Sequence, residues 1–180
     1  ASDTNSGHGT HVTGIIVGNG SGDNQTLGIA PAAEVNFYQI EYDTSGLLAR
    51  WGTIYSMFSH SLNNQARTHS NAWGSANQPG EYTTDSNSAD SFILDQPSYL
   101  AVFASGDQGS TQGATTTPPG TAKNVLTVGA SIQGSGGEQS SNSPWSNNSG
   151  GTLDGRIKPD LVAPGGGICS ARALEATAVP

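Results

Sequence analysis

Two runs of apolar residues constrain the fold of this chain more than any other feature. They occupy residues 99–104 (YLAVFA) and 125–130 (VLTVGA), and both are nearly continuous. Such runs are typical of parallel strands that are buried on both faces. Each run leads into a loop that contains glycine, and α/β proteins usually build their sites in the loops that follow parallel strands. We therefore predict two central strands here, with functional residues just beyond them.

The remaining sequence alternates between strand and helix patterns. Strands are expected at residues 35–40 and 67–71. Apolar residues recur at helical spacing over 47–62, which predicts a long amphipathic helix that ends near the asparagine pair following it. A second helix is expected at about 86–96. This order predicts an α/β fold of three layers, with a mostly parallel central sheet and helices on both faces.

Composition limits the size and the partners of the protein. The 180 residues are 33% hydrophobic and include 25 glycines, which suffices for one domain with a core, expected to span 1–180. A long surface loop is predicted between Ile132 and Leu153, where Gly, Ser and Asn dominate. A net charge of −8 with only six cations argues against a nucleic-acid partner. The sequence contains no apolar run long enough for a membrane span and no signal peptide, so we expect a soluble chain.

The segment 6–14 (SGHGTHVTG) places His8 at the start of a predicted helix. Val12, Ile15 and Ile16 recur on one face of that helix and are expected to anchor it in a core. The glycines on either side of His8 leave room for a substrate backbone to approach. An exposed imidazole in this position is suited to act as a general base.

Two other types of site compete with this interpretation. His8 and His11 could form half of a zinc site, but the remaining candidate ligands are only His60, His69 and Cys169, and the sequence contains no Cys-x-x-Cys or His-Glu-x-x-His pattern. Cys169 could be a nucleophile, but no neighbouring residue in the sequence would lower its pKa. We expect it to be a small buried hydrophobic residue.

Six short motifs follow one another along nearly the whole chain. They are HGTHVTG at 8–14, GIAPAA at 28–33, SNAWG at 70–74, ASGDQG at 104–109, PGTAKNVLTVGA at 119–130 and DGRIKPDLVAPG at 154–165. In content and order they resemble the motifs of the subtilisin-like serine peptidases, the subtilases, and most closely those of the oxidation-resistant alkaline bacterial branch. The resemblance implies a serine endopeptidase with a subtilisin-like fold.

The resemblance also implies site residues, with His8 as the general base and Asp107 at the oxyanion position. Substrate-binding residues implied in the same way are Ser70, Asn71, Ala72, Trp73, Gly74, Ser105 and Gly106. An extended peptide or protein substrate would pair with strand edges beside these residues, and Trp73 would belong either to the pocket or to the core.

The family also suggests accessory properties. No cofactor is required for the chemistry. Structural calcium is common in subtilases, and Asp23, Asp43 and Asp154 lie in loops that could supply ligands, although no twelve-residue calcium loop is present. Secretion is expected for a member of this family.

Two parts of the catalytic triad are missing from these 180 residues. The family's Asp-Ser/Thr-Gly motif lies tens of residues before the histidine motif, and Asp3 is too close to His8 to replace it. The nucleophile motif Gly-Thr-Ser-Met-Ala does not occur, and Ser70, Ser105 and Ser170 lie in motifs with other roles. The chain is therefore expected to be a truncated central portion, inactive alone. Flanking or complementary segments would then complete the site.

Asp107 is a second departure from the family pattern. Subtilases usually have an asparagine here, whose amide donates a hydrogen bond to the oxyanion. An ionised carboxylate has no proton to donate. Residues 105–109 (SGDQG) resemble the Ser-Gly-Asp-x-Gly motif of the sedolisin-type acid peptidases, in which the aspartate donates while protonated. Asp107 is thus either an acid-pH donor or a neutral change in a domain that no longer catalyses, such as a peptide-binding domain or an isolated fragment.

Overall fold

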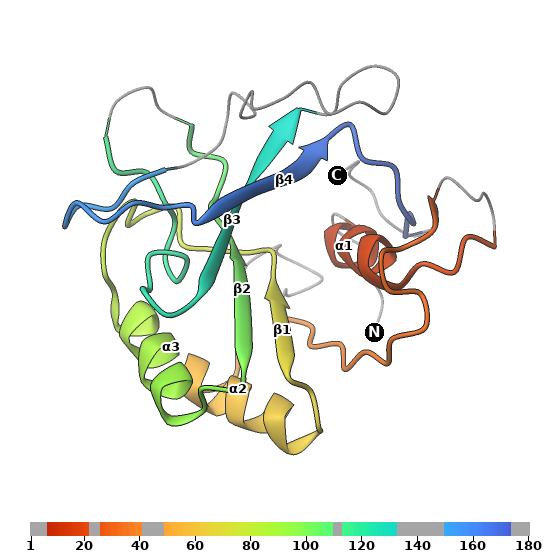
Figure 1. The fold of residues 1–180 in the computed structure, drawn as a ribbon, viewed down its shortest axis with the longest axis horizontal. Coiled ribbons are helices and arrows are strands. Elements are labelled where there is room, and N and C mark those ends of the chain that lie inside the picture. The colour runs from red at the N-terminus through yellow and green to blue at the C-terminus, as the bar shows by residue number, and fades with distance from the viewer. Residues whose placement is uncertain (1–6, 22–25, 41–48, 110–112, 133–149, 174–180) are drawn as a thin grey trace. The chain divides into compact units, whose positions relative to one another are not determined.

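The structure is a computed structural model that describes residues 7–21, 26–40, 49–109, 113–132 and 150–173 (Figure 1). The chain divides into two compact units. The first unit comprises residues 1–52 and 169–180, and the second comprises residues 53–168. The single domain expected from the sequence stays a prediction.

The second unit contains a parallel sheet of four strands. These are β1 (Thr68–Asn71), β2 (Leu100–Ala104), β3 (Leu126–Ile132) and β4 (Leu161–Gly166), in the order β1-β2-β3-β4. Every neighbouring pair is parallel (Figure 1). The carboxyl ends of all four strands therefore lie at one edge, where the following loops gather. The α/β class and the parallel sheet predicted from the sequence are confirmed.

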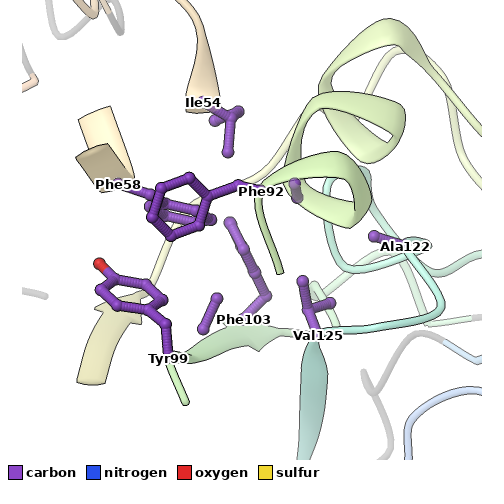
Figure 2. Close-up of a cluster of buried hydrophobic side chains, with 9 residues drawn as sticks. Ile54, Phe58, Phe92, Tyr99, Phe103, Ala122 and Val125 are labelled. Carbon is purple, nitrogen blue, oxygen red and sulfur yellow. The ribbon is translucent and has the colours of Figure 1, made fainter. Parts of the chain in front are cut away.

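Two helices, α2 (Ile54–Asn63) and α3 (Thr84–Asp95), cover one face of this sheet. Thr53 and Thr83 begin them as N-caps, with side chains that accept hydrogen bonds from the backbone three residues later. Between the helices and β2, apolar side chains point toward one another (Figure 2). The buried cluster consists of Ile54, Phe58, Ala89, Phe92, Tyr99, Ala101, Phe103, Ala122 and Val125. No described helix is both long and apolar enough to cross a membrane.

Two predicted elements differ from the structure. The strand expected at 35–40 is absent, and Phe37 in that segment is 56% exposed. The helix expected over 47–62 begins only at Ile54, because Gly52 has a left-handed φ of 68° and Thr53 caps the first turn. Residues 47 and 48 of the predicted helix lie outside the described part of the chain. The other helix and the strand at 67–71 lie close to their predicted positions.

The burial of β2 also differs from the prediction. Ala101 and Phe103 are fully buried, whereas Leu100 is 44% exposed and Ala104 is exposed. Successive side chains of a strand point to opposite faces, and α2 and α3 lie on the face of Phe103. The apolar run 99–104 therefore forms a strand that is well buried on one face only, and the prediction of burial on both faces was wrong for β2. Strand β4 was not predicted as a strand, because Pro164 and two glycines interrupt its pattern. Most of the predicted loop between Ile132 and Leu153 lies outside the described residues.

Candidate active site

His8 is the first residue of α1 (His8–Val17), in the first unit. Its side chain is exposed, as the sequence predicts. The preceding Gly7 is buried and has a left-handed φ of 72°, a conformation that residues with a Cβ adopt only at a cost. The Gly7 carbonyl accepts a hydrogen bond from the backbone N–H of His11 at 3.0 Å. The glycine thus starts the helix so that the imidazole is left accessible at its first turn.

Backbone contacts from residues 28–30 hold the carboxyl-terminal end of α1. The N–H groups of Gly28, Ile29 and Ala30 donate to the carbonyls of Gly18, Ile15 and Ile16 at 2.7, 3.0 and 2.8 Å. This is the role of the GIAPAA motif, and only glycine fits at position 28, where an added Cβ would lie 2.5 Å from the Gly18 nitrogen.

A second contact holds the middle of α1. Ser170 Oγ donates to the His11 carbonyl at 2.7 Å, so this serine supports the helix. No residue of α1 is fully buried, and Val12, Ile15 and Ile16 are only half-buried. The prediction that these three anchor the helix in a core was wrong, because hydrogen bonds to neighbouring segments hold α1 in the described part of this unit.

Asp107 lies in the second unit, in the loop that follows β2. Ser105, 2% exposed, links this loop to β3 through its N–H, which donates to the Val128 carbonyl at 2.9 Å. Gly106 has a left-handed φ of 98°. The next side chain, that of Asp107, is exposed at the carboxyl edge of the sheet. Both the rigid support of the loop and the exposure of the carboxyl group suit a residue that meets a substrate.

Thr117 joins the two segments predicted to bind substrate. Its N–H and Oγ1 both donate to the Ser105 carbonyl, at 2.9 and 3.3 Å. An ideal Cβ on Gly106 would lie 2.5 Å from Thr117 Cγ2, and one on Gly74 would lie 2.9 Å from Thr117 Cβ. The buried threonine side chain therefore fills the space that both glycines leave. The structure thus brings the ends of segments 70–74 and 105–106 together.

Sequence reasoning missed Thr117. It stands in a run of threonines before two prolines, outside the matched part of any motif. The only signal was indirect, since glycines in two separate motifs each required a close neighbour. A single residue that serves both glycines cannot be identified from the sequence alone.

Of the other residues in segment 70–74, some are buried and support the fold, and one is exposed on the surface. Ser70 is exposed. Asn71, which ends β1, is buried, and its Nδ2 donates to the carbonyls of His69 and Val102 at 3.2 and 3.1 Å. The ring of Trp73 meets Phe103 edge-on at 5.7 Å and packs against the core cluster. Asn71 and Trp73 therefore support the strand, while Ala72 is half-buried between them.

His69, His60 and Cys169, the other candidate zinc ligands, differ in their burial. His69 packs on Phe58 with ring centroids 5.0 Å apart, and burial lowers the pKa of His69. His60 lies on the exposed side of α2. Cys169 is exposed, contrary to the prediction, because it lies in a segment without regular structure that follows the left-handed Gly167. Across the described ranges, no three His, Cys, Asp or Glu residues form a group that could hold a metal ion.

Among the aspartates considered for calcium, Asp154 forms an ion pair. Its Oδ2 lies 2.8 Å from Arg156 Nη2. Hydrogen bonds from Arg156, and then from Thr152, lower the pKa of Asp154 to about 2. Asp23 and Asp43 lie outside the described residues, so structural calcium stays a prediction.

Comparisons with known proteins place these features in a family context. The model of the subtilase family matches residues 1–179. The serine protease/ABC transporter B family protein tagD of Dictyostelium discoideum is 33% identical over 132 residues, which cover 69% of this chain and 7% of that protein. Its relative tagA, from the same organism, is 30% identical over 145 residues, which cover 77% of this chain and 8% of that protein. The chain thus spans less than a tenth of the length of these relatives.

A solved structure shares the fold. The prenylagaramide maturation protease PagA superposes with a TM-score of 0.61 and 23% sequence identity, over 95% of this chain and 56% of that protein. The similarity confirms the overall α/β arrangement that the sequence predicts.

Proposed function

This chain belongs to the subtilase family, and from that premise we propose that it is the central part of the catalytic domain of a serine endopeptidase. The observation that carries the proposal is the match of the family model to residues 1–179, together with an exposed histidine at the start of α1 within the family's histidine motif. Hydrolysis of a peptide bond by a serine needs a base, a carboxylate that orients the base, and donors for the oxyanion. We assign the first and the last of these to this chain.

His8 is proposed as the general base. Its exposed imidazole can accept the proton of a serine hydroxyl and return it to the leaving amine, as a triad histidine does. The orienting aspartate and the nucleophilic serine are assigned to sequence outside these 180 residues, because neither motif occurs within them. The 180-residue chain alone is therefore expected to be inactive.

Asp107 is proposed as the oxyanion donor, active only while its carboxyl group is protonated. A protonated carboxyl offers one O–H donor, whereas the ionised form is an acceptor only and repels a developing negative charge. Removing one oxyanion donor costs about 3–4 kcal/mol of transition-state stabilisation. Turnover is therefore expected to be higher at acidic pH than at neutral pH.

The substrate is proposed to be an extended peptide or protein segment. The exposed loop at Asp107 and the segment 70–74 lie at the same edge of the sheet and share Thr117 as a support. A peptide could pair with backbone groups along both segments. We also propose that the parent protein is secreted, as the family resemblance implies.

A second candidate function follows from the same residue. If Asp107 stays ionised, the domain would bind peptides without cleaving them. The two functions predict different outcomes for the chemical labelling of the active site.

The experiment compares the 180-residue chain with a version extended by the flanking sequence of its gene. A fluorophosphonate probe is expected to label the extended protein and not the 180-residue chain. A His8→Ala variant of the extended protein should lose the labelling. A labelled serine within the 180 residues would overturn the assignment of the nucleophile, and an unlabelled extended protein that still binds peptide would favour the second function.

The role of Asp107 is tested by an Asp107→Asn variant of the extended protein. The asparagine amide donates at any pH, so this variant should keep its turnover at neutral pH where the parent loses it. Identical pH profiles for the two proteins would refute a protonated donor.

A further inference from the structure

An ion pair between buried Lys158 and exposed Asp160 lies at the start of β3 and β4. The Lys158 side chain is 3% exposed, and its Nζ donates to Asp160 Oδ2 at 2.7 Å and to the Val125 carbonyl at 3.0 Å. Removing the lysine ammonium group from water is costly, and the Asp160 side chain is 37% exposed, so water screens the attraction between the two charges. Stability alone is therefore a poor explanation for this pair.

The carboxylate of Asp160 holds Thr127, the second residue of β3. Asp160 Oδ2 accepts a hydrogen bond from the Thr127 N–H at 2.6 Å, and the Asp160 N–H donates to the Thr127 carbonyl at 2.9 Å. Both backbone groups of Thr127 are thus engaged by one residue. Because Lys158 donates to the same oxygen, Oδ2, and holds the carboxylate in place, the position of Thr127 is closely determined.

Thr127 in turn contacts the turn at residues 117–120, which precedes β3. Its Oγ1 donates to the Gly120 carbonyl at 2.6 Å. The Gly120 N–H donates in turn to the Thr117 carbonyl at 2.9 Å. An ideal Cβ on Gly120 would lie 3.0 Å from the Thr117 oxygen and 3.1 Å from the Ala104 oxygen. The turn is therefore packed tightly between Thr127 and the end of β2.

Thr117 completes the connection to the loop that carries Asp107. Its N–H and Oγ1 donate to the Ser105 carbonyl, and its side chain fills the space beside Gly106. Asp107 follows directly. A continuous series of hydrogen bonds therefore runs from Asp160 through Thr127, Gly120 and Thr117 to the loop.

We propose that Asp160 is a positioning residue for Asp107, acting through Thr127, Gly120 and Thr117, with Lys158 holding its carboxylate in place. The positioning role of Asp160 has a catalytic meaning only if Asp107 is the oxyanion donor, so the proposal rests on the proposed function. The coupling itself is a property of the second unit and can be measured without catalysis. A chain of contacts suggests coupling, and a demonstrated energetic interaction between its members establishes it.

The test measures amide hydrogen exchange by NMR in the 180-residue chain. The variants are Asp160→Ala, Thr127→Val and their double variant. Each single change is expected to speed exchange at the Thr117 amide about tenfold, the effect of losing one strong hydrogen bond. The double variant should be no faster than the faster single variant, because both changes break the same series of contacts. Amides of α2 and α3 should keep their protection.

Two further variants separate positioning from general destabilisation. Asp160→Asn keeps an oxygen that can accept from Thr127, so it should restore much of the lost protection at Thr117. Asp154→Ala removes another carboxylate paired with a cation in the same unit and should leave Thr117 exchange unchanged. If Asp160→Ala does not fold, Thr127→Val and Asp160→Asn still test the coupling.

Several outcomes would overturn the proposal. One is a double variant in which the two single increases in the Thr117 exchange rate multiply. Another is exchange that becomes faster throughout α2 and α3 as well. The third is faster exchange at the Thr127 amide with no change at Thr117. In the extended peptidase, Asp160→Ala is expected to lower kcat while KM stays unchanged, and Asp160→Asn is expected to keep most of the kcat. If the exchange coupling is found but no extended version cleaves peptides, the positioning series stands and the proposed function fails.

Discussion

Gly106→Ala is the substitution whose cost the structure predicts most directly. Gly106 has a left-handed φ of 98°, and Thr117 fills the space where a Cβ would lie. A left-handed conformation costs a residue with a Cβ about 1–2 kcal/mol. Thr117 cannot turn away freely, because Gly74 is packed against the same side chain. Overpacking of this kind costs about 1–3 kcal/mol, so we expect a total loss of about 2–5 kcal/mol.

Gly113→Ala is the matched control. Gly113 has a φ of 104°, but no atom lies within 4 Å of its ideal Cβ. This variant therefore bears the conformational cost alone, about 1–2 kcal/mol. The gain from a stiffer unfolded chain is the same for both variants and cancels in their difference. The difference between the two variants isolates the contact with Thr117.

Urea unfolding followed by circular dichroism gives the free energy of unfolding of each variant. The urea concentration at the unfolding midpoint should fall further for Gly106→Ala than for Gly113→Ala, while the dependence of the free energy on urea concentration stays unchanged. A Gly106→Ala, Thr117→Ala double variant should recover part of the difference, because the two closest atoms are removed. Equal losses for the two glycine variants, within about 0.5 kcal/mol, would refute the reasoning about Thr117.

Two further predictions concern a carboxylate and the core. Because the folded pKa of Asp154 is about 2 and its ordinary value is 3.8, its contribution to stability should be complete above about pH 4 and lost as the pH falls through 2. An NMR titration of this carboxyl group with a midpoint near 3.8 would contradict the contact with Arg156. Phe58→Ala should cost about 3–5 kcal/mol in chemical denaturation, because its ring lies within 5.5 Å of both Phe92 and Tyr99. A loss below about 1 kcal/mol would show that the cluster is not the core of the second unit.

The fold was predictable wherever short-range patterns determine it. Apolar runs located β2 and β3, and helical spacing located α3. The same reasoning placed a strand at 35–40, where Val35 and Phe37 alternate with polar residues but find no partner strand among the described residues. Pairing with a neighbouring strand is a tertiary event that a local pattern cannot supply.

The site was predictable to a different degree. The exposure of His8 and the position of Asp107 after a central strand both follow from local sequence. The contact of Thr117 with two glycines does not, because Thr117 lies 43 positions after Gly74 and only the paired strands bring them together. The burial of Lys158 was also invisible, since a lysine in a polar motif is normally solvated.

The exposure of Cys169 makes the molecule chemically addressable at one point. It is the only cysteine in the sequence, so a maleimide dye or spin label would attach at a single site without any other thiol being removed. The residue lies at the boundary where the chain passes from the second unit into the first. A reporter group there would therefore offer a test, in a simple fluorescence titration, of whether the flanking segments proposed above bind to this chain.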